Sequence, residues 1–269
     1  MNFVKMHGAG NDYIFVDCLH QTIDDMSALA VEMSDRHFGV GSDGVVYLYP
    51  SMVADIKMRM FNADGSEGAM CGNAVRCIGR FLSEKSDKRE FTVETNSGLK
   101  TVTHIDSDIY SVDMGKPEID EVRTIFVCGQ SLKFTYVSMG NPHCVIFVDD
   151  VDSVDMRIGE EIEHHSYFPD GINVEFVEGK NENLKIRVWE RGSGETLSCG
   201  TGACAAVAAS VKCGICPIDT DITVSLRGGN LKVKYSRSLY LTGNAVKVYE
   251  GDYYDKVHFC DRRSCQRPR

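Results

Sequence analysis

Apolar and polar residues alternate in short runs along almost the whole chain. The runs are rich in β-branched and aromatic residues and are separated by glycine and polar turns, a pattern typical of β-strands. They predict strands at 13–16, 45–48, 91–94, 144–148, 185–189 and 231–235. Three longer segments repeat apolar residues every three or four positions, which predicts helices at 26–36, 73–85 and 202–213. We therefore expect an α/β (α+β) protein.

The most unusual stretch of the chain occurs twice. MCGNAVRC at 70–77 returns as SCGTGACA at 198–205, about 130 residues later. Further landmarks keep the same order and nearly the same spacing: Gly10-Asn11 with Gly140-Asn141, Asp43-Gly44 with Asp170-Gly171, Asn62 with Glu190, and Ser97-Gly98 with Gly228-Gly229. This period is far longer than the units of solenoid proteins. We expect two pseudo-symmetric domains, 1–116 and 117–248, each an antiparallel-rich curled sheet around a central helix, with the active site in the cleft between them.

Composition and charge agree with a soluble enzyme of two domains. The chain has 269 residues, of which 43% are hydrophobic and 25% charged. Its formal net charge of −10 argues against nucleic acid as a partner, because phosphate binding requires a concentrated basic surface. No basic segment followed by an apolar stretch opens the sequence, and no run approaches a membrane span. We expect a cytoplasmic protein with no membrane partner.

The cysteines indicate free thiols rather than a disulfide framework. There are 11 of them, in a chain without a secretion signal. Most, including Cys18, Cys128 and Cys144, lie in apolar runs and are expected to be small buried hydrophobes. Cys213 and Cys216 form a CxxC pair that could be half of a zinc site with Cys260 and Cys265. We rank that site low and predict no metal.

Two cysteines stand apart because each directly precedes a predicted helix. Cys71 and Cys199 would face the positive end of a helix dipole and free backbone N–H groups, which favour a thiolate. We therefore expect a lowered thiol pKa. The same N–H groups can bind a substrate carboxylate, and Gly72 and Gly200 carry no Cβ to block its approach. Beside them, Asn73 and Thr201 add polar side chains.

Two such helices meeting at a pseudo-twofold interface would place the sulfur atoms on opposite sides of one bound carbon. One thiolate could then remove a proton from one face of the carbon while the opposite thiol delivers a proton to the other face. A single base would return the proton to the face it came from. This arrangement suits inversion of a stereocentre.

At these residues the sequence resembles the diaminopimelate epimerase family. MHGAGNDYIFVD, GVGSDG, NADGSEGAMCGNAVRC, MGNPHCV, GINVEF and WERGSGETLSCGTGACA follow one another over nearly the whole chain. The resemblance implies a cofactor-independent isomerase that interconverts LL-2,6-diaminopimelate and meso-2,6-diaminopimelate, in lysine and peptidoglycan precursor biosynthesis. It implies that Cys71 and Cys199 are the two acid/base residues and that the enzyme is a homodimer.

The resemblance also implies a set of substrate-binding residues. Gly72, Asn73, Gly200 and Thr201 would hold the carboxylate at the reacting centre. The remainder of the substrate would be bound by Asn11, Asn62, Asn141, Asn173, Glu190 and Arg191. His143 and Glu190 are further candidates for setting the protonation of the thiols. The chemistry is reasonable because arginine grips a carboxylate bidentately, and a glutamate accepts hydrogen bonds from an ammonium group.

Some segments lie at the edge of the resemblance or depart from it. The stretch 249–257 is expected to return and pack on the first domain, and 258–269 is expected to be a loose tail. Gly44 stands where some members carry a side chain that can reach the substrate. Ala74 replaces a glycine that is frequent at its position.

Other functions remain open at this point. One is a related cofactor-free racemase, such as a proline or hydroxyproline racemase, although its small ring would not need so many distal polar contacts. Another is a thiol-redox protein in which Cys71 and Cys199 form a disulfide. A binding module without turnover and a pyridoxal phosphate enzyme are further alternatives, but neither explains the duplicated cysteines.

Overall fold

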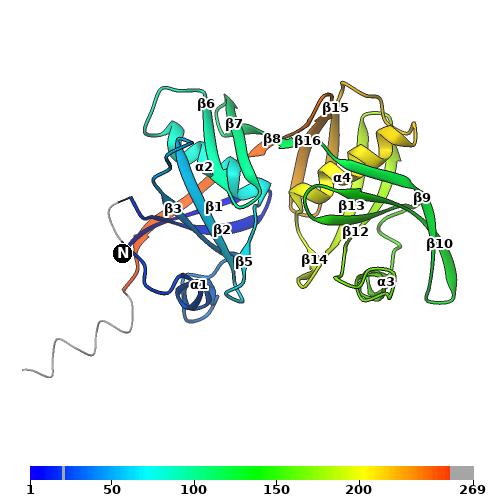
Figure 1. Ribbon diagram of the computed structural model, residues 1–269, viewed down its shortest axis with the longest axis horizontal. Coiled ribbons are helices and arrows are strands. Elements are labelled where there is room, and N and C mark those ends of the chain that lie inside the picture. The colour runs from blue at the N-terminus through cyan, green and yellow to red at the C-terminus, as the bar shows by residue number, and fades with distance from the viewer. Residues whose placement is uncertain (20–21, 255–269) are drawn as a thin grey trace, which may run out of the picture.

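The computed structural model describes residues 1–19 and 22–254 as two similar halves side by side (Figure 1). The first half contains, in chain order, β1 (Asn2–Gly8), β2 (Asn11–Asp17), α1 (Met26–Ser34), β3 (Gly44–Tyr49), β4 (Ile56–Asn62), β5 (Glu67–Gly68), α2 (Gly72–Ser83), β6 (Glu90–Thr95), β7 (Gly98–Asp106) and β8 (Ile109–Gly115). The second half contains β9 (Glu118–Val127), β10 (Gln130–Ser138), β11 (Pro142–Phe147), α3 (Arg157–Glu163), β12 (Asn173–Lys180), β13 (Asn183–Glu190), β14 (Gly194–Thr196), α4 (Gly200–Lys212), β15 (Asp221–Leu226), β16 (Gly229–Tyr235) and β17 (Leu239–Asn244). A last strand, β18 (Val246–Asp252), follows.

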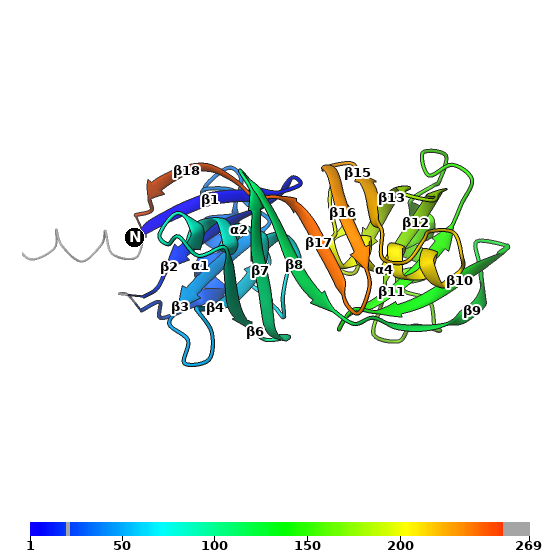
Figure 2. The same cartoon turned by 90° about the horizontal axis from the view of Figure 1, so that it is seen from above.

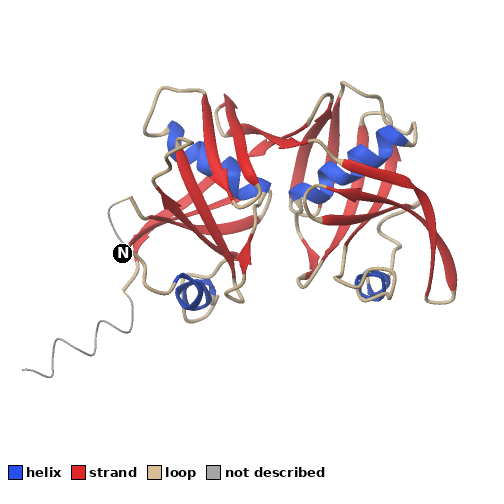
Figure 3. Cartoon of the chain, in the orientation of Figure 1, coloured by secondary structure: helices blue, strands red, loops and turns tan. Residues whose placement is uncertain are grey.

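Each half repeats the same strand pattern around one buried helix. Most neighbouring strands are antiparallel, and the parallel pairs fall at matching places: β2–β3 and β4–β6 in the first half, β11–β12 and β13–β15 in the second. Strands surround α2 in one half and α4 in the other (Figure 3). This is the mixed α/β, sheet-rich architecture with two repeated halves that the sequence predicts, and that prediction is confirmed.

Two strand pairs join the halves. In the view of Figure 2, β8 and β17 run between them, and they pair antiparallel from Gly115 opposite Leu239 to Ile109 opposite Asn244. The chain then crosses back, because β18 pairs with β1 from Asp252 opposite Asn2 to Val246 opposite His7. All the strands therefore belong to one continuous 18-stranded sheet. The returning strand begins at Val246, earlier than the expected 249.

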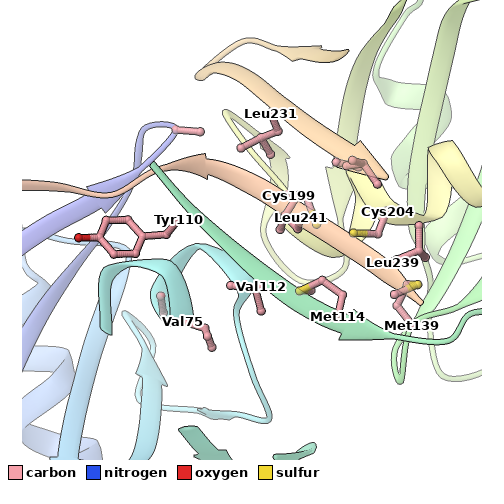
Figure 4. Packing of buried hydrophobic residues seen from close by; sticks show 14 of the residues in the cluster. Val75, Tyr110, Val112, Met114, Met139, Cys199, Cys204, Leu231, Leu239 and Leu241 are labelled. Atoms are coloured by element: carbon pink, nitrogen blue, oxygen red, sulfur yellow. The ribbon is translucent and has the colours of Figure 1, made fainter. Parts of the chain in front are cut away.

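One apolar core extends across the junction. It includes Val75 of α2, Met114 of β8, and Leu239 and Leu241 of β17, all buried, together with Cys199 (Figure 4). The two central helices enter this core differently. Every residue from Gly200 to Ser210 of α4 is buried, whereas α2 carries its arginines among apolar residues. Burial of this kind, rather than helix propensity, supplies most of the stability of such helices.

The predicted elements correspond closely to the observed ones, with a few differences. The helices predicted at 26–36, 73–85 and 202–213 are α1, α2 and α4. The short α3 escaped prediction because its sequence RIGEEIE has too few turns to show a helical period. Cys128 is exposed, contrary to expectation, because it lies at the β9–β10 turn with a φ of 49°. The tail 258–269, with Cys260 and Cys265, and the end of the stretch 249–257 lie outside the described residues.

Candidate active site

The two central helices meet at their N-termini. A Cβ built on Gly200 would lie 3.8 Å from the Cα of Gly72 and 2.9 Å from Leu241 Cδ2, and one built on Gly72 would lie at the same 2.9 Å from that atom. Leu241 therefore packs against the first residue of both helices. A Cβ at either position would displace the Leu241 side chain, so glycine lets this leucine pack against both helix ends. The close approach of the helices brings the two cysteines that precede these glycines to the same junction.

Cys71 lies within a group of amide side chains. Its thiol donates to the Oδ1 atom of Asn11 across 3.4 Å, and the Nδ2 atom of Asn73 donates to the same oxygen across 3.1 Å. Tyr13 of β2 also hydrogen-bonds the Cys71 sulfur. Cys71 is partly exposed, while Asn73 and Tyr13 are buried. The structure thus brings together three of the predicted site residues and adds Tyr13.

Cys199 occupies the equivalent place in the second half. Its sulfur accepts a hydrogen bond from the backbone N–H of Gly202 across 3.3 Å, which caps α4. The hydroxyl of Thr201 lies 3.5 Å from the sulfur and accepts from Asn141 Nδ2 across 3.3 Å. Glu190 also interacts with the Cys199 thiol, since each group shifts the pKa of the other.

Both thiols have a raised pKa, contrary to the expectation from the helix dipole. For Cys71 the main cause is burial, which outweighs the hydrogen bonds from backbone N–H groups that lower its pKa. For Cys199 burial again comes first, and the nearby carboxylates of Glu190 and Glu175 raise the pKa further. The sequence prediction was wrong because it considered only the local helix end. Desolvation depends on the surrounding fold.

His143 and Glu175 form a pair that is completely buried. The His143 Nδ1 atom lies 2.7 Å from Glu175 Oε1, and both side chains have no exposed surface. The other polar atoms of the pair, His143 Nε2 and Glu175 Oε2, have no hydrogen-bond partner. Burial also raises the pKa of Glu190. Glu175 raises that pKa further, and His143 lowers it. Charged groups thus gather on the side of the site that belongs to Cys199.

Sequence reasoning missed Tyr13 and Glu175, although both left a signal. Tyr13 stands about 130 residues before His143, the offset of the repeat, so the two occupy matching positions. Glu175 is a charged residue inside the apolar strand NVEFV. Strand pairing also changes one match. Tyr13 lies opposite Gly44 and His143 lies opposite Asn173, so Gly44 corresponds to Asn173 rather than to Gly171.

Three more predicted site residues, Asn62, Asn173 and Arg191, lie at or next to strand ends and bond to groups other than the cysteines. Asn62 donates to Ser66 Oγ across 3.0 Å. Asn173 accepts from the Arg191 backbone N–H across 3.0 Å, and the exposed Arg191 guanidinium donates to the Asp170 carbonyl oxygen. These side chains form no hydrogen bond with either cysteine that the structure records.

Neither a metal cluster nor a membrane span is found in the part of the chain that the structure describes. No group of three or more His, Cys, Asp or Glu side chains in residues 1–19 and 22–254 could hold a metal ion. Within the same residues, no helix is long and apolar enough to cross a membrane. A hollow of about 650 Å³ involves Asn181, Gly214, Cys216 and their neighbours, and none of the predicted site residues lines it.

The sequence was compared with known protein families. The family model for Diaminopimelate epimerase matches residues 3–119 and 135–253. The chain belongs to the diaminopimelate epimerase family. A diaminopimelate epimerase of Acetivibrio thermocellus is 47% identical, with 94% of this chain and 98% of that protein covered. One of Methanococcus maripaludis strain S2 is 45% identical, with 94% and 99% covered. Membership places the chain among the isomerases.

Solved structures show that the fold is shared more widely than this family. A Bacillus anthracis phenazine biosynthesis protein of the PhzF family has a TM-score of 0.74 at 17% identity, covering 95% of this chain and 99% of that chain. A hydroxyproline epimerase of Agrobacterium vitis has a TM-score of 0.69 at 17% identity, covering 96% and 93%. At this identity the likeness concerns the fold alone. The relatives in the diaminopimelate epimerase family favour that assignment over the proline-racemase-like alternative.

Proposed function

We propose that this chain interconverts LL- and meso-diaminopimelate without a cofactor, in lysine and peptidoglycan precursor biosynthesis, with Cys71 and Cys199 as the two acid/base groups. The observation that carries the proposal is the contact between the two helix N-termini at Gly72 and Gly200, each preceded by a cysteine. Family membership supports diaminopimelate as the substrate. In this proposal the substrate lies between two domains, 1–116 and 117–248.

In this mechanism the helix N-termini hold the substrate's α-carboxylate through Gly72, Asn73, Gly200 and Thr201. The α-carbon then lies between the sulfurs. One cysteine, as thiolate, takes the α-proton, and the other, as thiol, delivers a proton to the opposite face. In the reverse reaction the two exchange roles. A raised thiol pKa suits this step, because the thiolate of a weaker acid is a stronger base towards a carbon acid.

The protonation of the pair would be set mainly on the Cys199 side. Glu190 interacts with that thiol, and we propose that it accepts the thiol proton when Cys199 acts as the base. In the buried pair, Glu175 acts electrostatically on the same sulfur, and both Glu175 and His143 act on Glu190. We propose Glu190 and His143 as groups that tune the thiols rather than as groups that touch the α-carbon.

The far end of the substrate needs partners for a second carboxylate and a second ammonium group. We propose that the Arg191 guanidinium binds the distal carboxylate, since it is exposed and held near Asn173 through its own backbone. Amide groups of Asn11, Asn62, Asn141 and Asn173 would complete the recognition. A proline-like substrate lacks this distal end.

A homodimer in the cytoplasm completes the proposal. Val248 and Tyr249 of β18 are 53% and 45% exposed, respectively, and such neighbouring apolar side chains suit an interface between copies. Working thiols require a reducing compartment. Light scattering after size exclusion tests the dimer, and a monomeric mass at micromolar concentration would contradict it.

The decisive experiment is incubation of the reduced protein with meso-diaminopimelate in D2O without added cofactor. We expect deuterium at the α-carbon together with formation of the LL isomer. Cys213→Ala is the control, because Cys213 is exposed and remote from the site. If the thiols are shown to be reduced and no deuterium enters, the proposal is wrong. Enzyme activity that required a reversible Cys71–Cys199 disulfide would favour the thiol-redox alternative.

A further inference from the structure

Arg76 of α2 is an unusual residue in this core. Its side chain has no exposed surface, and among the described residues no carboxylate pairs with it. The Nη2 atom donates to Asn73 Oδ1 across 2.7 Å and Nε donates to the Asn244 carbonyl oxygen across 3.3 Å, while Nη1 has no partner. Gly8 leaves the space, because a Cβ there would lie 2.8 Å from Nη2. A buried cation without a counter-ion is costly, which suggests a task other than stability.

Arg76 begins a chain of hydrogen bonds whose direction is determined at both ends. A guanidinium only donates, so the atom of Asn73 that faces it must be the oxygen. The nitrogen of Asn73 then donates to the oxygen of Asn11, across 3.1 Å. At the other end, the Asn11 nitrogen donates to Asp43 Oδ2 across 2.7 Å.

Asp43 is suited to the accepting end. Its Oδ2 atom also accepts from the Asp12 backbone N–H, and its Oδ1 atom accepts from Arg36 Nη2 across 2.9 Å. Both of these partners only donate. When Asp43 is ionised its oxygens only accept, so the two ends of the chain require the same orientation of the Asn11 amide.

We propose that the chain Arg76–Asn73–Asn11–Asp43 is a positioning device that keeps the oxygen of Asn11 against the Cys71 sulfur and thereby favours the protonated thiol in the empty site. An oxygen there can accept from an S–H group, whereas a thiolate would face lone pairs. Backbone N–H groups lower the pKa of both thiols, and at Cys71 the Asn11 oxygen opposes that effect. The inference rests on the proposed function only in assigning Cys71 an acid/base role.

Other groups also act on Cys71, and the test must separate them from the chain. The titratable and charged groups that face it are Tyr13 of β2, Arg76 and Cys77 of α2, and Glu190 of β13. Loss of the Arg76 charge alone would disfavour the thiolate, and loss of the Asp43 charge alone would favour it. If charge were the whole effect, the two changes would therefore oppose each other and combine additively.

The experiment measures the alkylation rate of Cys71 by iodoacetamide between pH 6 and pH 10, identified by mass spectrometry of its peptide, in a Cys199→Ala background. The variants are Arg76→Met, Asp43→Ala and the two combined. Either end of the chain is enough to hold the Asn11 amide in its orientation. We therefore expect little change of that orientation in either single variant. In the double variant Asn11 can turn its nitrogen to the sulfur, and alkylation near pH 7 should exceed the product of the single effects about tenfold.

Two controls make the outcome specific. Arg80→Met removes a guanidinium from the same helix that pairs with Glu84 rather than Asn73, and should not couple to Asp43→Ala. Arg76→Lys keeps a group that only donates, and should restore the single-variant rate when combined with Asp43→Ala. If the alkylation rate of the double variant equals the product of the two single effects, the proposal is wrong. This outcome does not depend on the identity of the enzyme's substrate.

A direct measurement covers the case in which the double variant does not fold. Neutron diffraction from deuterium-exchanged crystals of the unaltered protein locates the deuterons of the Asn11 and Asn73 amides. The proposal expects both deuterons of Asn11 on the atom that faces Asp43. Deuterons on the Asn11 atom that faces the Cys71 sulfur would refute it.

Discussion

Glu175→Gln should make the Cys199 thiol a stronger acid. A Cβ built on Gly202 would lie 2.7 Å from Glu175 Oε1 and 3.3 Å from Cys199 Sγ, so the carboxylate oxygen and the sulfur are at most about 6 Å apart. The negative carboxylate opposes formation of a second negative charge on the sulfur and raises its pKa, after burial and Glu190. The amide has the same shape without the charge, and it can still accept from His143.

The size of the effect follows from the distance. Two unit charges about 6 Å apart interact by about 3 kcal/mol at an effective dielectric constant of about 20. That energy corresponds to about a hundredfold change in the thiolate fraction below the pKa. The hydrogen bond from His143 Nδ1, 2.7 Å long, spreads the carboxylate charge and reduces the effect. We therefore expect a gain of at least about tenfold.

The assay is the rate of Cys199 alkylation by iodoacetamide as a function of pH, read from its peptide by mass spectrometry. Glu178→Gln is the matched control, because Glu178 lies on the same strand but its carboxylate accepts from Val151 N–H. Circular dichroism confirms that both variants fold. An unchanged or slower reaction in Glu175→Gln would show that this carboxylate does not act on the Cys199 thiol.

Three further predictions follow from the site and its packing. Cys71→Ala and Cys199→Ala should each reduce epimerisation at least about a thousandfold without loss of fold, because each removes one of two required proton carriers; appreciable turnover in either contradicts the two-base scheme. Arg191→Lys should raise KM about tenfold or more, since an ammonium cannot reproduce a planar fork, and an unchanged KM removes Arg191 from the site. Leu241→Ala should lower the free energy of unfolding by about 2–5 kcal/mol through a cavity at both helix ends, measured in urea against the more exposed Tyr240→Ala; equal losses would contradict it.

Much of the fold could be predicted because its signals are local. Strands show an alternation of apolar and polar residues, and α2 and α4 show a helical apolar period. These signals depend only on neighbours a few residues away. The repeat of MCGNAVRC as SCGTGACA further indicated two halves of one design. The short α3 lacked enough turns to be recognised. Cys128 was predicted to be buried but is exposed. It is a turn residue at the end of an apolar run, and the sequence pattern does not separate it from the strand.

The sequence offered candidate site residues by number, but it did not offer Tyr13 or Glu175, and it did not predict the electrostatics of the thiols. A cysteine before a helix can be read from the sequence, and so can the amides that the repeat pairs with it. The sequence does not show that burial raises the pKa of both thiols. It also does not show that Glu175 and Glu190 both act on Cys199, because desolvation and Coulomb energy depend on distances between segments far apart in the chain.

Most elements and the two cysteines at the helix starts could be recognised from residue type and spacing within one segment, and the duplication from comparing two segments. Where those segments meet depends on the packing of the whole fold. Pairing of β8 with β17 brings Leu241 between the first residues of both helices. The chain of hydrogen bonds from Arg76 through Asn73 and Asn11 to Asp43 likewise links three segments that no local pattern relates. Such contacts are long-range in the chain, and the physical chemistry of the thiols follows from them.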